Sequence, residues 1–399
     1  MRHRIIHIVP EWPSYSQTFV IDDIKISERV FDQTLVFPLP FREKTFSSKF
    51  VNFFDFLASI PVAIRRCSMK ESRDELLFLF RSRHGFRSKC LVIYVFLSSI
   101  TLIRKCRIWE FHDQTVLHAH FFSTGLEIAV LVKREFPGVR IVATGHGSDV
   151  FYQSHSILEY FVRNVDLIIT ASNAVLTSIG QKLLNTSIDV DKKMILRYCR
   201  LPLSEFSPKP IFDKFESRKL RILTVARFHP QKGLDIALES AIALRDLGVN
   251  FSWTFVGGGS LRQELEASAN ESNMGNFLNF MGVQTRETVQ QCMSQADIFI
   301  LPSVTLHNAS DGLPVVILEA MNMGAYVITT NVGGISEAID SERGSIVEPK
   351  TEKIVQEILM IKDNKLIAIQ RINSARQWVQ LHCLQGDTDP LHKAYLSFR

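Results

Sequence analysis

Residues 298–330 read IFILPSVTLHNASDGLPVVILEAMNMGAYVITT and contain a strand, a helix and a second strand in one run. Ile298–Leu301 is short, β-branched and apolar, and a proline and a polar loop end it. Pro314 is a favoured first helical residue, and Gly324 closes the helix that it begins. Tyr326–Thr330 is then a second apolar strand. Two strands joined by a helix in this way are typical of a parallel sheet that helices cover.

The same alternation of short apolar runs and helical segments recurs along the chain. Continuous apolar strands that alternate with helices indicate parallel sheets covered on both faces. Two such series are separated near Pro202–Pro210, where prolines and polar residues predict a linker. We therefore predict an α/β fold of two Rossmann-like doubly wound domains that face a cleft, spanning residues 1–204 and 205–377. The other expected strands are Ile5–Val9, Ile141–Thr144, Leu167–Thr170, Ile222–Ala226, Phe251–Val256 and Ser345–Val347.

Composition describes a globular chain and excludes several classes of function. The net charge of +5 is modest, and no basic stripe with interleaved aromatic residues is present, so we predict no nucleic-acid binding. The six cysteines are scattered without a Cys-x-x-Cys pair, which favours reduced thiols in the cytoplasm over disulfides or a zinc site. The first apolar run is too short for a signal peptide, and no segment reaches the length of a membrane-spanning helix.

The segment 51–108 is richer in arginine and lysine than in acidic residues, and it contains the apolar run Cys90–Ile103. One interpretation is a buried helix whose flanking charges are solvated. The other is peripheral docking on an anionic membrane, at the inner face of the plasma membrane, because such surfaces bind apolar and basic side chains together. The sequence leaves both interpretations open, and the apolar run is too short to span a bilayer.

Two carboxylates flank the start of the helix in the opening stretch. Asp311 lies just before this helix, and Glu319 lies inside it, eight residues later. Gly312 and Leu313 lead into the helix, whose first amides can bind an anion or a sugar hydroxyl. Two carboxylates in these positions can accept hydrogen bonds from two hydroxylated groups of one ligand. A helix cap and a surface charge are the alternative interpretation.

Three further loops follow expected strands. Arg227 and Lys232 lie on one loop, where two cations would stabilise the charge of a departing diphosphate, although solvated surface cations would have the same sequence. Gly257–Gly259 allow a ligand to approach the backbone closely, but a tight turn uses the same residues. His146 lies between two glycines at a strand end, where it contacts a ligand or only completes the local structure.

The pattern of Asp311, Glu319 and Gly333–Glu337 resembles the acidic signature of retaining GT-B glycosyltransferases of family 4 (glycosyl transferases group 1), of the exopolysaccharide and colanic-acid type. The first acidic residue of that family is usually Glu, so Asp311 keeps the charge and shortens the reach by one methylene. The resemblance implies that Asp311 contacts the donor sugar and that Glu319 binds the ribose hydroxyls. It covers nearly the whole chain and is weakest between Phe41 and Trp109.

The same resemblance assigns roles to the other loops. Arg227 and Lys232 match the pair that holds the donor diphosphate and largely replaces a metal, and His146 matches a loop that positions the sugar or the acceptor. His118 and His120 lie in a stretch that resembles a further loop of the family, and without a fourth ligand they are not expected to bind a metal. The donor side is completed by Gly258, Val283, Gly312 and Leu313, and the acceptor side by Ser16, Gln17, Thr18 and His120.

The function that the resemblance implies is transfer of a hexose, with retention of configuration, from a UDP- or GDP-type donor to a saccharide hydroxyl, free or lipid-linked, in surface polysaccharide biosynthesis. The acceptor would attack from the front face while the leaving diphosphate takes its proton, and no cofactor or metal is expected. A nucleotide-sugar epimerase on the same fold and a degenerate sugar-binding relative remain the alternatives. The last segment, 378–399, is expected to pack back onto the first domain.

Overall fold

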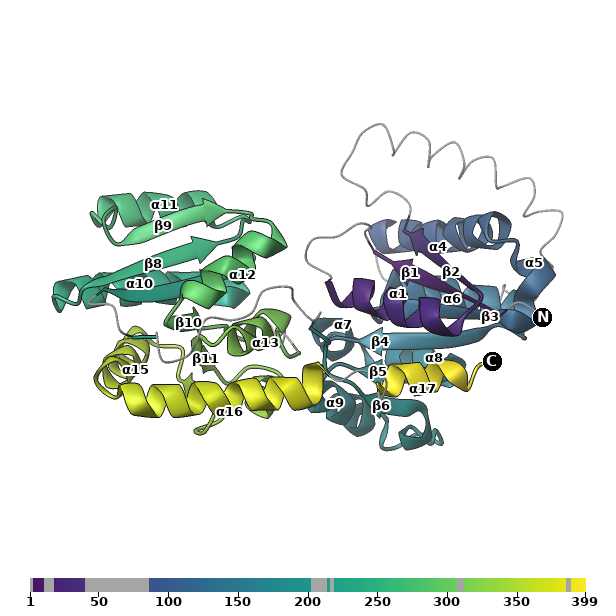
Figure 1. Cartoon of the computed structure of the whole chain (residues 1–399). Helices are drawn as coiled ribbons and strands as arrows, with labels where there is room; N and C mark the ends of the chain where they lie inside the picture. The colour runs from purple at the N-terminus through teal and green to yellow at the C-terminus, as the bar shows by residue number, and fades with distance from the viewer. Residues whose placement is uncertain are drawn as a thin grey trace. The chain divides into compact units, whose positions relative to one another are not determined.

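The structure of the 399-residue chain is a computed structural model. It describes residues 3–10, 18–39, 86–201, 214–215, 219–306, 312–384 and 389–399. The chain divides into two compact units, which Figure 1 shows. Unit 1 holds residues 1–171, 175–197 and 387–399, and unit 2 holds residues 172–174 and 198–386. The predicted linker at 202–210 lies outside the described residues.

Unit 1 is built on a six-stranded sheet with the order β2-β1-β3-β4-β5-β6, in which neighbouring strands are parallel. Its strands are β1 (Arg4–Val9), β2 (Gln33–Pro38), β3 (Thr115–His120), β4 (Arg140–Gly145), β5 (Leu167–Thr170) and β6 (Met194–Leu196). The helices of this part of the chain are α1 (Thr18–Val30), α4 (Phe86–Lys105), α5 (Ile108–Phe111), α6 (Thr124–Glu135), α7 (Ser148–Phe151), α8 (His155–Asn164), α9 (Asn173–Leu183) and the C-terminal α17 (Pro390–Leu396).

Both faces of this sheet are covered, because alternate residues of each strand point to opposite sides. In β1, Ile6 and Ile8 pack into a core shared with α4 and α6. Ile5 packs on the other face, where Ile26 of α1 and Leu391 of α17 complete a second core. The apolar runs read from the sequence are continuous for this reason: a strand in a doubly covered sheet has no solvent-facing side.

The C-terminal helix α17 is attached to unit 1 by a buried polar network. Arg197 donates to the Asp23 carboxylate at 2.8 Å and to both Asp389 oxygens at 2.8 and 3.1 Å. Asp389 also caps α17 by accepting from a backbone amide of its first turn at 2.7 Å. The Tyr395 hydroxyl is hydrogen-bonded to His118 Nδ1 at 2.6 Å. The helix that precedes α17, α16 (Lys365–Cys383), belongs to unit 2, so only the last part of the segment 378–399 packs on unit 1.

Unit 2 repeats the architecture with a parallel sheet of order β12-β11-β10-β7-β8-β9 (Figure 1). Its strands are β7 (Leu220–Val225), β8 (Phe251–Val256), β9 (Leu278–Gly282), β10 (Ile298–Leu301), β11 (Tyr326–Thr330) and β12 (Ser345–Val347). The helices beside α16 are α10 (Leu234–Asp246), α11 (Arg262–Glu271), α12 (Arg286–Gln295), α13 (Val315–Asn322), α14 (Ile335–Ala338) and α15 (Thr351–Asp363). The predicted α/β class with two parallel sheets is confirmed.

The apolar run Cys90–Ile103 lies within α4, whose side chains are described from Tyr94 onward. Val95, Leu102 and Ile103 are buried in the core beneath this helix, as the buried-helix interpretation requires. No helix in the described ranges is both long enough and apolar enough to cross a membrane. The structure describes the side chains of four cysteines, and none of these four is in a disulfide: Cys106, Cys199, Cys292 and Cys383.

Candidate functional site

The loops that follow the strands of unit 2 are hydrogen-bonded to one another through their backbones. The loop after β10 joins the loop after β7 through Val304 N–H and Gln231 C=O, at 2.9 Å. The loop after β7 joins the loop after β8 through Phe228 N–H and Gly258 C=O, also at 2.9 Å. Gly312, in the loop before α13, accepts from the turn after β11 at 2.7 Å. The carboxyl edge of this sheet is therefore one connected surface, and ligands of open α/β sheets bind at such an edge.

Arg227 and Lys232 are placed by the first of these loops. β7 ends at Val225, and a short 3-10 turn, Pro230–Lys232, begins after the His229 ring accepts from a backbone amide. Gly233 closes the turn with φ of +60°, and a Cβ at that position would lie 2.0 Å from the Pro302 carbonyl oxygen. The glycine therefore allows the Lys232 turn to touch the loop after β10. Lys232 is mostly buried, with 9% of its surface exposed, which does not fit a freely solvated cation.

Two glycines of the run after β8 are required by the packing of the protein's own loops. A Cβ on Gly257 would lie 1.8 Å from the Ala226 carbonyl oxygen, and one on Gly259 would lie 2.4 Å from that of Phe228. Both residues also have positive φ, of +138° and +153°. These two glycines are required because the β7 and β8 loops pack together. Gly258 differs: the one neighbour that its Cβ would meet is the Val283 side chain, at 3.0 Å.

Val283 follows β9 at the edge of the sheet, and 74% of its surface is exposed. A large apolar side chain left this open beside Gly258 forms a small platform on which a planar group can pack. Both Gly258 and Val283 are among the donor-side residues that the family resemblance implies.

Glu319 lies in α13, and its carboxyl group is largely buried. Its side chain is 17% exposed, and desolvation raises its pKa to about 7, against an opposing effect from Arg286. The Arg286 Nη2 atom lies 3.8 Å from Glu319 Oε1. Gly312 and Leu313 are both buried just before the helix, and Pro314 occupies its cap position. Glu319 is thus not the solvated surface charge of the alternative interpretation. Asp311 lies outside the described residues.

In unit 1, the predicted His146 loop follows β4 and is ordered by Asp149. This carboxylate accepts from the backbone amides of His146, Gly147 and Phe122 at 3.0, 2.8 and 2.9 Å. The imidazole packs between the rings of Phe19 and Phe121, with centroid distances of 4.2 and 4.7 Å. Burial, with a smaller effect of the Arg197 charge, lowers the pKa of His146 to about 3. His146 is therefore neutral at pH 7 and can donate or accept a hydrogen bond there but supplies no positive charge.

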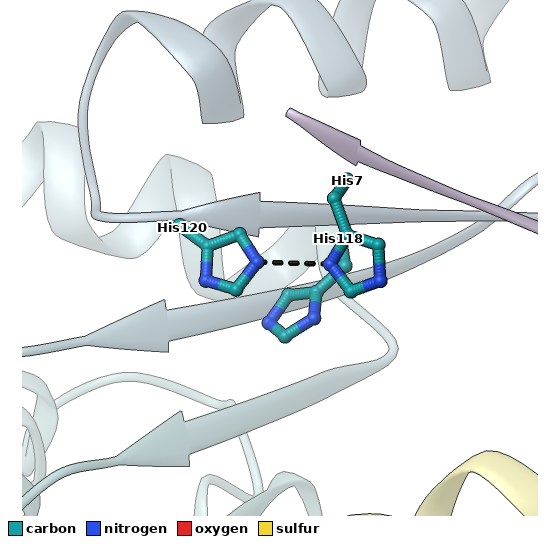
Figure 2. Close-up of side chains that lie close together, drawn as sticks. All are labelled: His7, His118 and His120. Carbon is teal, nitrogen blue, oxygen red and sulfur yellow. Dashed lines mark hydrogen bonds between the residues drawn. The ribbon is translucent and has the colours of Figure 1, made fainter. Parts of the chain in front are cut away.

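The stretch around His118 and His120, expected to be a loop, is the central strand β3. Both histidines point to the same face, and β1 places His7 directly beside His118 in the register. Figure 2 shows the three rings together. All three are fully buried, so His120 offers no surface for the direct acceptor contact that the sequence predicts. Ser16 and Gln17 lie outside the described residues, and Thr18 is the first residue of α1.

Among the described residues, these three histidines are the group whose ligand atoms lie close enough to hold a metal ion, within 4.8 Å of one another. Five of their six ring nitrogens are engaged in hydrogen bonds, and the sixth, His120 Nδ1, is buried without a hydrogen-bond partner among the described residues. His7 bonds His120 Nε2 through Nδ1, as the dashed line in Figure 2 shows, and Ser27 through Nε2, both at 2.9 Å. His118 bonds Thr144 at 2.7 Å as well as Tyr395. The cluster therefore satisfies most of its own polar atoms, and its rings form a buried neutral network.

The comparisons with known proteins bear on this edge of unit 2. Residues 209–378 match the family model described as glycosyl transferases group 1. This match lies within unit 2 and covers less than half of the chain. The matched range covers the strand-edge loops of Arg227, Lys232 and Glu319, and it ends inside α16.

Two curated relatives carry related names. A putative colanic acid biosynthesis glycosyltransferase, WcaL of Escherichia coli K12, is 26% identical over 242 residues, which are 59% of this chain and 58% of the relative. The amylovoran biosynthesis glycosyltransferase AmsK of Erwinia amylovora is 33% identical over 132 residues, which are 33% of this chain and 32% of the relative. The chain thus spans less than two thirds of the length of either relative.

Solved structures of the same fold cover both units. Anabaena HepE, solved in complex with UDP and glucose, superposes with a TM-score of 0.67 at 15% identity, over 99% of this chain and 97% of that one. A sucrose-phosphate synthase from Thermosynechococcus elongatus gives the same TM-score at 16% identity, over 96% and 95%. At these identities the likeness shows the fold, which is GT-B, as the sequence predicts.

Proposed function

We propose that the chain is a retaining glycosyltransferase that moves a hexose from a nucleotide-diphosphate sugar to a saccharide hydroxyl in surface polysaccharide biosynthesis. The observation that carries the proposal is the connected carboxyl edge of unit 2. There, backbone hydrogen bonds fix the loops after β7, β8 and β10 to one another, and Arg227 and Lys232 lie on the first of these loops. The relatives named for colanic acid and amylovoran biosynthesis support the polysaccharide pathway.

The roles follow from the chemistry of each group. Two cations at one loop stabilise the negative charge that grows on a leaving diphosphate as the glycosidic bond breaks. Glu319 accepts hydrogen bonds from ribose hydroxyls, and Gly258 with Val283 packs against the base, of UDP or GDP type. Asp311 contacts the donor sugar. In unit 1, neutral His146 hydrogen-bonds the transferred sugar or the acceptor. No protein nucleophile is required, since the acceptor attacks from the front face and the leaving diphosphate takes its proton.

A panel of nucleotides and nucleotide sugars tests the proposal through thermal stability, because a ligand that binds only the folded chain raises its melting temperature. The matching UDP or GDP compound should stabilise the protein, and the sugar should then be transferred to an added saccharide acceptor. Product formed from donor alone would indicate an epimerase instead. Donor binding without turnover on a genuine acceptor would indicate a sugar-binding relative. Stabilisation by neither nucleotide would refute the proposal.

Two further elements belong to the same proposal. Catalysis proceeds without a metal, because Arg227 and Lys232 supply the positive charge, so turnover should be unchanged in EDTA and without added Mg²⁺. The acceptor is a free or lipid-linked saccharide, and the basic segment 51–108 brings the enzyme to the anionic inner face of the plasma membrane. The membrane contact predicts that the full chain pellets with anionic vesicles at low salt and not at high salt. Failure to pellet at low salt would refute that contact alone.

A further inference from the structure

Arg286 is the first residue of α12, the helix that packs beside α13 and therefore beside Glu319. The start of α12 is fixed by Thr285, whose hydroxyl accepts from the amide of Thr288 at 3.3 Å. This cap places the Arg286 guanidinium at a defined position. Its side chain is 29% exposed, but its Nε and Nη2 atoms are buried and have no hydrogen-bond partner among the residues that the structure describes.

Buried donors without partners are uncommon in folded proteins, because each loses its hydration without a replacement. Here an acceptor of opposite charge is close by, yet the Arg286 Nη2 to Glu319 Oε1 distance of 3.8 Å is too long for a hydrogen bond. Paired arginine and carboxylate groups normally approach to under 3 Å. The two groups therefore lie side by side without a hydrogen bond between these atoms, and the Arg286 donors have hydrogen-bonding capacity left to fill.

The two opposite charges decide which chemical group can bind beside both side chains. A phosphate or carboxylate would be attracted by Arg286 and repelled by Glu319, and an ammonium group would meet the reverse. A hydroxyl group is neutral, donates one hydrogen bond and accepts others, so it satisfies both sides at once. Each hydroxyl of a vicinal diol can donate to a Glu319 oxygen and accept from one of the two guanidinium N–H groups.

We propose that Arg286 is a specificity-determining residue that, together with Glu319, holds the ribose diol of the donor nucleotide and selects it against deoxyribose. This inference rests on the proposed function. The assignment of Glu319 to the ribose leaves the acceptor lone pairs of the diol without a partner, and Arg286 provides the donors that complete the site. A nucleotide lacking one hydroxyl would leave a guanidinium donor and a carboxylate oxygen unpaired and buried.

The test is isothermal titration of UDP and GDP, each beside its 2′-deoxy and 3′-deoxy counterparts, into the full-length wild-type protein and its variants. The wild-type protein should bind the preferred ribonucleotide about 10- to 100-fold more tightly than at least one deoxy form, since a hydrogen bond to a buried charged group is lost. Arg286→Gln should weaken binding of the ribonucleotide by a similar factor and leave binding of that deoxy form nearly unchanged, so the ratio of affinities falls towards one. Arg286→Lys should give an intermediate ratio, because one ammonium replaces a fixed two-donor fork.

Arg343→Gln is the matched control, because Arg343 is also an arginine of unit 2 paired with a carboxylate, but its bonds to Asp340 are already made at 3.1 and 2.7 Å. This variant should keep the wild-type ratio. Equal loss of ribonucleotide and deoxynucleotide binding in Arg286→Gln would overturn the proposal, as would no loss of either, provided that the melting temperature shows the variant to be folded. If the wild-type protein binds no nucleoside diphosphate at all, the proposed function itself fails, which is a separate outcome.

Discussion

Acid should destabilise unit 1 through the histidines that it buries in neutral form. Burial lowers the pKa of His7 and of His146 to about 3, whereas an unfolded histidine titrates at 6.5. A group whose pKa is lower in the folded state than in the unfolded state favours unfolding once the pH drops below the unfolded value. The loss of stability therefore begins below pH 6.5 and continues until the folded groups titrate near pH 3.

The size of the effect follows from the separation of the two values. At pH 5 each of these histidines lies about 1.5 units below its unfolded pKa, which corresponds to about 2 kcal/mol per residue. Asp23 has the opposite effect, since burial raises its pKa to about 6. Between pH 7 and pH 5 it adds about 1 kcal/mol to the free energy of unfolding. The net loss in unit 1 between pH 7 and pH 5 is therefore about 2 to 3 kcal/mol. His118 and His120, whose pKa values burial also lowers, add to this loss.

Unit 2 should respond with the opposite sign. Burial raises the pKa of Glu319 to about 7 from its ordinary value of 4.5, so unit 2 gains about 2 kcal/mol over the same interval. Urea unfolding at pH 7 and pH 5, followed by pulsed hydrogen exchange and mass spectrometry, measures the stability of each unit separately. Peptides of β1 and β3 report on unit 1, and peptides of β8 and β10 report on unit 2. His7→Gln should remove about 2 kcal/mol of the pH dependence of unit 1. Unchanged or increased stability of unit 1 at pH 5 would refute the reasoning.

Three further predictions follow from the site and the fold. Lys232→Ala should lower kcat by about 100-fold or more in initial-rate assays, because a cation is removed from the leaving diphosphate; wild-type turnover in a folded variant would contradict its role. Asp389→Asn should lower the stability of unit 1 by about 3 kcal/mol and speed hydrogen exchange in α17, because the buried Arg197 charge loses one of its two carboxylate partners. Asp363→Asn removes an exposed ion pair with Lys362 and should change neither. Nucleotide affinity, measured by titration calorimetry, should fall about fivefold from pH 7 to pH 6 as Glu319 protonates, and Glu319→Gln should lack this component; an identical pH dependence in both proteins would show that Glu319 does not accept from the ligand.

Most of the strands that could be predicted from the sequence are buried inner strands, whereas β12, predicted with its observed bounds Ser345–Val347, is a partly exposed edge strand. Leu167–Thr170, Phe251–Val256 and Ile298–Leu301 have the same bounds in the structure as in the prediction. The other edge strands have weaker sequence signals: β2 and β9 have partly exposed residues, and β6 has only three residues. β3 lies at the centre of its sheet, but the sequence does not mark it as a strand, because its two histidines interrupt the apolar run. Their burial depends on hydrogen bonds to residues far away in the chain, which periodicity does not reveal.

The same limit applies to the site. Glu319 and Lys232 lie at fixed distances from strands and glycines in the sequence, so their loops could be recognised there. Arg286 has no such mark: it is a helix-initiating residue 33 positions before Glu319, and only the packing of α12 beside α13 brings the two together. His7 is likewise hidden from the sequence, since it joins His118 through the register of β1 and β3. Contacts that tertiary packing creates between separate elements need the fold before they can be seen.

The glycine run after β8 shows how the fold and the site share the same residues. Glycine could be needed there for close approach of a ligand or for a tight turn, and the sequence does not separate the two. In the structure, Gly257 and Gly259 are each required by a backbone carbonyl of the β7 loop, while Gly258 faces Val283 at the open edge. The packing of one loop on another is thus completed without any ligand, and it holds the Lys232 turn and the Gly258 backbone in place. A site whose loops are already ordered avoids the entropic cost of ordering them when the nucleotide binds, and its charges need not reorganise as the diphosphate leaves.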